Sequence, residues 1–290
     1  MNIRYSSIPG AAILIGCVSA LVGMSAHAAI TANYTPGDLI LGFQSSASTA
    51  TVLEVNIGPN AQFKNSSSPF LIGNIGTQLV NNFGATWYDS PNLFFGVSGA
   101  NNNSSLSAGS ADPNGDFNST IYASRARTSN GSVGLSGSVP WSSSAASVTT
   151  AASPMLQQAG TFDANDVSGI ATIATSVAND WSDFNPVSGT AQNPAYASVF
   201  ASGIQYRFDT GTFDTGNFGG LTDVEAAVDI YRIARFSNGG GTPGVGTYIG
   251  TVAIERDGDI QFVSVPEPAS LTFVGFGLAA LLGLRRRRAA

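Results

Sequence analysis

Cysteine and histidine are nearly absent from this sequence. The one cysteine, Cys17, and the one histidine, His27, both fall within the first 28 of its 290 residues. Residues 29–264 therefore contain no thiol or imidazole for a disulfide, a Ser-His-Asp triad, a Cys-His protease, haem ligation or the usual zinc sites. We predict no catalytic, cofactor-binding or metal site there, and expect stability to come from the burial of apolar side chains.

The N-terminal residues combine one basic residue, Arg4, with an apolar stretch from Ala11 to Met24 and the sequence Ala26-His27-Ala28. A positive start, a hydrophobic region and a small-x-small site are typical of a secretory signal peptide. We expect a signal peptide over residues 1–28, with cleavage after Ala28. An uncleaved transmembrane anchor is the alternative, although the apolar region is short for one.

The C-terminal residues 265–290 combine three features in a fixed order. Pro266, Glu267 and Pro268 come first, and the two prolines favour an extended backbone that a docking enzyme can bind. The uncharged residues 269–284 would span roughly 24 Å as a helix, slightly less than the ~30 Å hydrocarbon core. Four arginines, Arg285, Arg286, Arg287 and Arg288, then favour the cytoplasmic side of the membrane. An ordinary C-terminal anchor after a proline-containing linker would share these features.

This tail resembles the PEP-CTERM sorting signal of Gram-negative bacteria, with Pro266, Glu267 and Pro268 as its motif. The resemblance implies recognition by an exosortase, transient anchoring in the inner membrane, and delivery to the cell surface, outer membrane or extracellular matrix. The region between the ends is similar to a loosely defined group of PEP-CTERM cargo proteins. That second resemblance implies no activity.

The region between the two ends is strongly acidic. Arg4 and the four C-terminal arginines account for five of the 12 basic residues, and Glu267 for one of the 18 acidic residues. Seven basic and seventeen acidic residues remain, so the exported body carries a net charge near −10. Such a surface repels nucleic acid, which we exclude as a partner.

The body, residues 29–264, is long enough for one large domain and is rich in Gly, Ser, Thr, Ala and Asn. Alternating or continuous apolar runs bounded by turn residues predict a mainly β, antiparallel, sandwich-like domain. The predicted strands are 38–43, 51–57, 93–97, 119–124, 201–208 and 224–236, and a final hairpin over 248–263 turns at Asp257-Gly258.

One or two short helices are expected beside the sheet. Residues 74–83 have apolar side chains at helical spacing, with Asn74 as a plausible N-cap and Gly84 after the end. Residues 167–181 give the clearest helical pattern, with Asp163 or Asp166 as its cap. The Ser-, Gly- and Ala-rich residues 129–154 are predicted to be a long excursion or linker, which Val139, Trp141 and Val148 could attach to the core.

Two Asp-rich motifs have chemical interpretations. Asp209-Thr210-Gly211 and Asp214-Thr215-Gly216 carry the aspartic-protease signature, but five residues separate them in one loop, which favours tandem turns. Residues 112–118 place oxygen ligands at alternate positions, so calcium binding is a hypothesis beside an ordinary turn. Its glycine is misplaced for an EF-hand.

Three glutamates, Glu54, Glu225 and Glu255, could supply the two acids of a glycoside hydrolase. Each lies within a predicted strand, and we predict that they occupy solvated strand faces.

These patterns together predict an exported, non-enzymatic, mainly β protein of the cell surface or matrix. Its expected partners are the secretion machinery, an exosortase, the inner membrane before processing, and extracellular polysaccharide or biofilm. A carboxylate-dependent hydrolase such as a glycosidase is the alternative, and a self-assembling sheath protein is a third class.

Overall fold

A computed structural model gives the fold of this chain. It describes residues 29–48, 50–101, 110–112, 115–127, 138–185, 187, 198–200, 203–208, 221, 223–236 and 242–264. The predicted signal peptide and the sorting tail from residue 265 lie outside these residues. Within the described residues the fold is mainly β and antiparallel, which confirms that part of the predicted fold class.

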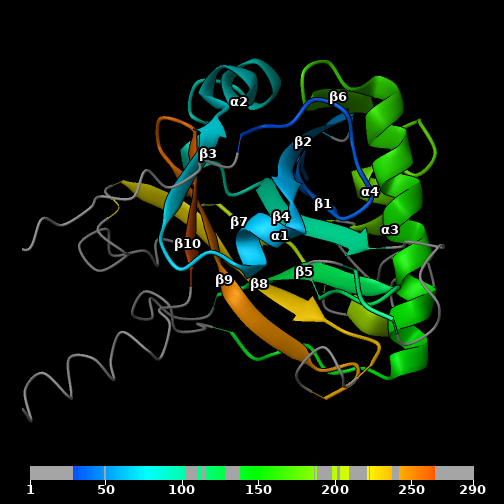
Figure 1. The fold of residues 1–290 in the computed structure, drawn as a ribbon. Helices are drawn as coiled ribbons and strands as arrows, with labels where there is room; N and C mark the ends of the chain where they lie inside the picture. Colours follow the sequence, from blue (N-terminus) through cyan, green and yellow to red (C-terminus); the bar gives the residue numbers. More distant parts are fainter. Residues whose placement is uncertain are drawn as a thin grey trace, which may run out of the picture.

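The described strands form one ten-stranded sheet (Figure 1). The order across it is β3-β10-β9-β8-β5-β4-β1-β2-β6, and β7 pairs with β4 off this path. The strands are β1 (Asp38–Ser45), β2 (Thr51–Pro59), β3 (Phe70–Asn74), β4 (Leu93–Asn101), β5 (Thr120–Ala126), β6 (Ile170–Ala174), β7 (Tyr206–Arg207), β8 (Val224–Ile233), β9 (Gly246–Glu255) and β10 (Asp259–Ser264).

The helices of the described part are more extensive than predicted. A 21-residue helix, α3, runs along one side of the sheet in Figure 1, and four shorter helical segments accompany it. Their bounds are α1 (Asn60–Lys64), α2 (Gly76–Phe83), η1 (Trp87–Asp89), α3 (Ala145–Asn165) and α4 (Trp181–Phe184).

Strand β1 shows how the sheet acquires two cores. Leu39, Leu41 and Phe43 join one apolar cluster, on what we call the inner face of the sheet. Ile40 points to the opposite, outer face, where it joins a second cluster that includes side chains of α3. Because side chains alternate along a strand, a run that is apolar at successive positions is buried on both faces.

The sheet curls around the inner cluster (Figure 1). Helix α1 adds Phe63 to this cluster, where its ring contacts those of Phe70 and Phe262 at centroid distances of 5.7 and 5.1 Å. The sandwich-like arrangement predicted from the sequence is therefore replaced by one curled sheet that has helix α3 on its outer face.

Two predictions about residues 129–181 are wrong. Residues 145–154, predicted as linker, are the first half of α3, with Pro154 inside the helix. Residues 167–181, predicted as a helix, contain strand β6, which pairs with β2, and Asp166 is the C-cap of α3 rather than an N-cap. Trp141 and Val148 are buried as expected, whereas Val139 is 71% exposed.

Most predicted strands are confirmed, including the β1–β2 pair and the closing hairpin of β9 and β10. Gly258 has a φ of +91° in the hairpin turn, whereas Asp257 needs no positive φ. The strand expected over 201–208 shrinks to β7. Helix α2 begins at Gly76 with Ile75 as N-cap, and Asn74 instead accepts the Gly76 N–H through Oδ1 at 3.0 Å. Gly84 follows α2, as predicted.

Helix α4 docks on the outer face through Trp181. The indole ring of Trp181 covers Gly42 of β1, where a Cβ atom would lie 2.0 Å from the ring. Trp181 is fully buried and belongs to the outer cluster. Glycine at position 42 therefore lets the indole ring lie directly against the sheet.

Candidate functional site

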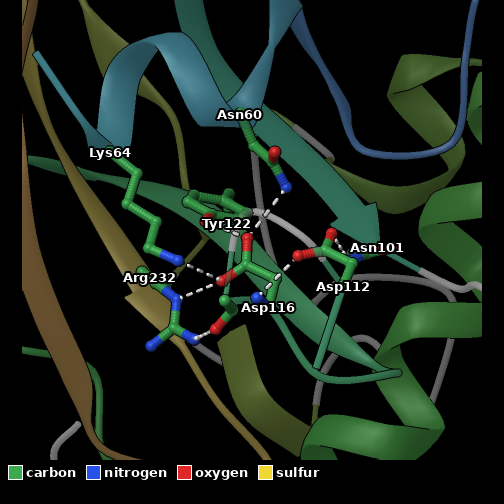
Figure 2. A network of polar contacts seen from close by, with 8 residues as sticks. Asn60, Lys64, Asn101, Asp112, Asp116, Tyr122 and Arg232 are labelled. Carbon is green, nitrogen blue, oxygen red and sulfur yellow. Dashed lines mark hydrogen bonds and ion pairs between the residues drawn. The ribbon is translucent and has the colours of Figure 1, made fainter. Parts of the chain in front are cut away.

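A network of charged side chains surrounds Asp116 (Figure 2). Asp116 Oδ1 accepts from Arg232 Nε at 2.6 Å and from Lys64 Nζ at 3.1 Å. Its Oδ2 accepts from Tyr122 Oη at 2.5 Å and from Asn60 Nδ2 at 3.1 Å. Both oxygens of this fully buried carboxylate are thus occupied by donors from α1, β5 and β8.

Asp112 stabilises the loop that carries Asp116 by accepting two hydrogen bonds. Its Oδ1 accepts the Asp116 N–H at 2.8 Å, and its Oδ2 accepts from Asn101 Nδ2 at 2.8 Å. Gly115 turns the chain between the two acids with a φ of +78°. The carboxylates of the calcium hypothesis therefore anchor this loop to the sheet in the structure.

The Asp116 network also determines local electrostatics. Burial, followed by the nearby Asp116 carboxylate, raises the pKa of Tyr122 well above its ordinary value, so the phenol stays protonated and donates. Removing one partner of such a buried ion pair typically costs about 3 to 5 kcal/mol. Sequence reasoning missed this cluster, because Lys64 and Arg232 lie 52 and 116 positions from Asp116 and share no motif with it.

Glu54 contradicts the prediction of a solvated strand face. Its side chain is 0% exposed on β2, and its Oε1 accepts the backbone N–H of Trp181 at 2.9 Å. In the described part, Glu54 Oε2 has no hydrogen-bond partner. Burial raises the pKa of Glu54 to about 8, against the lowering effects of the Trp181 N–H and the Gln158 side chain.

Glu225 and Glu255 lie on β8 and β9, away from Glu54 in the strand order, so the three glutamates do not come together. Glu225 forms an ion pair with Arg256 at 2.6 Å. Glu255 lies beside Asp257 and Asp259, and one carboxylate oxygen from each falls within 4.8 Å of the others. Burial and these two neighbours raise the pKa of Glu255.

This acidic turn is the one group in the described ranges with three acids close enough for a single ion. It borders a surface cavity of about 290 Å³ lined by Asp223, Glu255, Arg256 and Asp257. Two of its acids already serve the hairpin, since Asp257 accepts the Asp259 N–H and Asp259 accepts from Asn74 Nδ2 at 2.7 Å. Oxygen ligands of this kind suit calcium.

A second surface hollow differs in chemistry. It also measures about 290 Å³ and lies where α1 leads into β3. Its lining contains no charged side chain, and consists of Ala61, Gln62, Asn65, Ser66, Ser67, Ser68 and Phe70. Amides and hydroxyls at a small open hollow can donate to and accept from a neutral polar ligand.

The two Asp-Thr-Gly motifs and the sorting residues Pro266 to Pro268 and Arg285 to Arg288 lie outside the described residues. The structure shows where the tail begins. Strand β10 ends at Ser264, and Val263 and Ser264 are 1% and 3% exposed. One residue, Val265, therefore separates the buried strand from Pro266.

Comparison with family models finds the PEP-CTERM protein-sorting motif at residues 264–288. The chain carries a PEP-CTERM sorting motif. This confirms the resemblance seen in the tail, and it indicates an exported protein that is recognised by exosortase and processed at the membrane. Searches of curated proteins and of solved structures find no match.

The PEP-CTERM match covers the tail alone, so a role for the body must be argued from its structure. Among the described residues, no helix is both long and apolar enough to cross a membrane. The predicted span at 269–284 lies beyond them.

Proposed function

We propose that this chain is a non-enzymatic protein of the cell surface or extracellular matrix, whose body associates with exopolysaccharide in a biofilm. The observation that carries the proposal is the PEP-CTERM motif at residues 264–288, directly after the last strand of the body. The general secretory pathway exports the chain, the tail directs its processing by exosortase, and the body acts at the final location.

The residue types of the body favour binding over catalysis. Cys17 and His27 both precede the body. Two of its buried acids are held by cations: Asp116 is bound by Lys64 and Arg232, and Asp229 pairs with Arg127 at 2.5 Å. A glycosidase would need two acids about 5 to 10 Å apart across a cleft.

The uncharged hollow beside α1 is the location that best suits a sugar. Gln62 and Asn65 supply amides, and the three serines Ser66 to Ser68 lie between them and Phe70. No aromatic side chain is among the large apolar residues that the described part exposes, so sugar stacking on an exposed ring is not part of this proposal. Hydrogen bonds from neutral groups also suit an acidic body, which would repel acidic polymers.

The proposal is tested by retention of the full chain on polysaccharide from the producing cells. The double variant Gln62→Ala/Asn65→Ala should lose at least fivefold in retention, because both amides of the hollow are removed. Asn81→Ala, an exposed amide of α2, is the matched control and should bind as the natural chain does.

Three outcomes would contradict this proposal. Absence of retention on any matrix fraction removes polysaccharide as the ligand. Release of reducing sugars from the same material would establish a glycosidase instead. Ordered self-assembly without polysaccharide would place the protein in the sheath class.

A further inference from the structure

The first residues of the body bridge the two ends of the sheet. Strands β3 and β6 stand at opposite ends of the strand order. The side chain of Ile30 lies next to a glycine at each end: a Cβ atom at Gly73 of β3 would lie 2.9 Å from Ile30 Cδ1, and one at Gly169, before β6, would lie 2.7 Å from Ile30 Cγ2. Curling of the sheet thus brings its two ends to the same side chain.

Backbone hydrogen bonds continue this bridge. Thr31 N donates to Asn56 O at 3.1 Å, and Asn56 N donates to Gly169 O at 2.9 Å. The chain from residue 29 to residue 34, which we call the strap, is therefore joined to β2 and to the turn before β6. Ile30 packs against the inner cluster from this position.

The strap also fastens the end of α3. Tyr34 N donates to Asp163 Oδ1 at 3.0 Å, and Asn33 N donates to Asp166 Oδ2 at 3.3 Å. Tyr34 packs against the outer cluster. Six residues therefore contact both cores, both ends of the sheet and the longest helix.

We propose that the strap is a closing device, which seats between β3 and β6 after the leader ahead of it has been removed and so completes the exported fold. The proposal rests on the proposed export, because the expected cleavage after Ala28 leaves the strap at the new N-terminus. Before cleavage, only Ala29 separates Ile30 from Ala28, and these two steps along the chain reach at most about 7 Å. A leader held in the membrane therefore keeps Ile30 from the gap between the two strands.

The glycines at positions 73 and 169 suit this seat. Gly169 has a φ of +85°, which side chains rarely adopt, and a side chain at either position would occupy the space of Ile30. The lack of a side chain at Gly73 and Gly169 thus leaves the space that the Ile30 side chain fills.

The test is cross-linking of the full chain in a Gram-negative host, in a Cys17→Ser background. The double variant Ile30→Cys/Gly73→Cys should form a disulfide in most exported molecules, because a cysteine at 73 has its Cβ within contact distance of residue 30. Each single cysteine variant is the control, and should show no intramolecular bond.

A second arm blocks leader removal with Ala28→Lys in the double cysteine variant. The expected yield of disulfide falls at least fivefold in molecules that reach the membrane with the leader attached. Equal yields with and without the leader would overturn the dependence on cleavage, and no disulfide in the cleaved chain would overturn the strap. If export itself fails, all variants remain in the cytoplasmic fraction, which separates that failure from the other two.

A third arm measures the effect of the strap on the sheet. Ile30→Ala should speed amide exchange at least tenfold in β3 and β6 and leave the central strand β8 unchanged. Val139→Ala, an aliphatic truncation at a 71% exposed position, should change neither. An equal increase of the exchange rate in all strands of the Ile30→Ala variant would contradict a local closing role.

Discussion

Asp116, in the loop before β5, and Glu54, on β2, are both fully buried acids, but the charged groups around them differ in sign. Asp116 lies between two cations, Lys64 and Arg232, and accepts hydrogen bonds on both oxygens. Glu54 has only neutral donors, the Trp181 N–H and the Gln158 side chain, and the charged group that acts on it is another acid, Asp180, whose pKa is also raised by burial. A buried charge is tolerated where cations and donors compensate it, and a proton replaces them where they do not.

This difference separates two kinds of stability. The contribution of the Asp116 network depends on its two cations and its hydrogen-bond donors being present. The Glu54 site depends on a proton, and therefore on the pH of the surrounding medium. The following substitutions test each half of this comparison, in order of expected effect.

The largest expected loss comes from Arg232→Met. This change leaves Asp116 with one cation, and Arg232 Nη2 also donates to Gly115 O at 3.2 Å. We expect the free energy of unfolding to fall by about 3 to 5 kcal/mol in urea titrations followed by tryptophan fluorescence. Arg207→Met on β7 is exposed and should change it by less than about 0.5 kcal/mol. Equal losses in both variants would show that the Asp116 network contributes no more stability than an exposed arginine does.

Glu54→Gln tests the proton-dependent half. The pKa of Glu54 is about 8 in the folded chain and 4.5 by its ordinary value, so folding retains the proton. The stability from this group is present below pH 4.5, declines as pH rises, and is lower by about 3 kcal/mol at pH 7. The amide keeps an acceptor for Trp181, so the variant should gain stability at pH 7 and lose this slope.

The control for Glu54→Gln is Glu225→Gln, which removes a carboxylate from an ion pair whose arginine is 56% exposed. Its unfolding curves should keep the wild-type slope between pH 5 and pH 8. A wild-type chain with no decline in stability across that interval would disprove the protonated state of Glu54.

Gly42→Ala tests what isolates Glu54 from water, with the smallest expected effect. Gly42 is paired with Glu54 across β1 and β2, and the added methyl would meet the Trp181 ring. Overpacking of this kind costs about 1 to 3 kcal/mol. Displacement of Trp181 admits water, so the decline of stability with pH should become shallower. Gly160→Ala in α3 meets nothing within 4 Å and should stabilise slightly.

The strands of this fold could be predicted because their signals are local. The run at 38–43, the alternation at 51–57 and the Asp257-Gly258 turn each carry their pattern within a few residues. The tail could be predicted for the same reason, since its motif, span and arginines are contiguous.

The helix predictions were wrong where tertiary contacts outweigh the local spacing of apolar residues. Residues 167–181 place apolar side chains at helical intervals, but pairing of Ile170–Ala174 with β2 makes them a strand. Helix α3 carries many small residues and Pro154, so its sequence resembles a linker. The burial of Val148, Met155 and Phe162 against the sheet supplies the stability that its local pattern lacks.

The chemistry of the candidate sites could be predicted less well than the strands. A glutamate on a strand has the same local sequence whether water or Trp181 covers it, and Trp181 lies 127 residues away from Glu54. The pairing of Asp116 with Arg232 is equally remote. Ionisation states follow from such distant neighbours, which no spacing rule contains.

The position of β10 has a mechanical consequence for a chain whose sorting motif begins at the last residue of this strand. β10 is hydrogen-bonded to β9 on one side and to β3 on the other, and the tail continues from its last residue. Tension on the tail therefore loads two ladders of hydrogen bonds at once, instead of peeling a strand from the edge of the sheet. A pull on the residues that follow Ser264 is therefore resisted by β10 in shear.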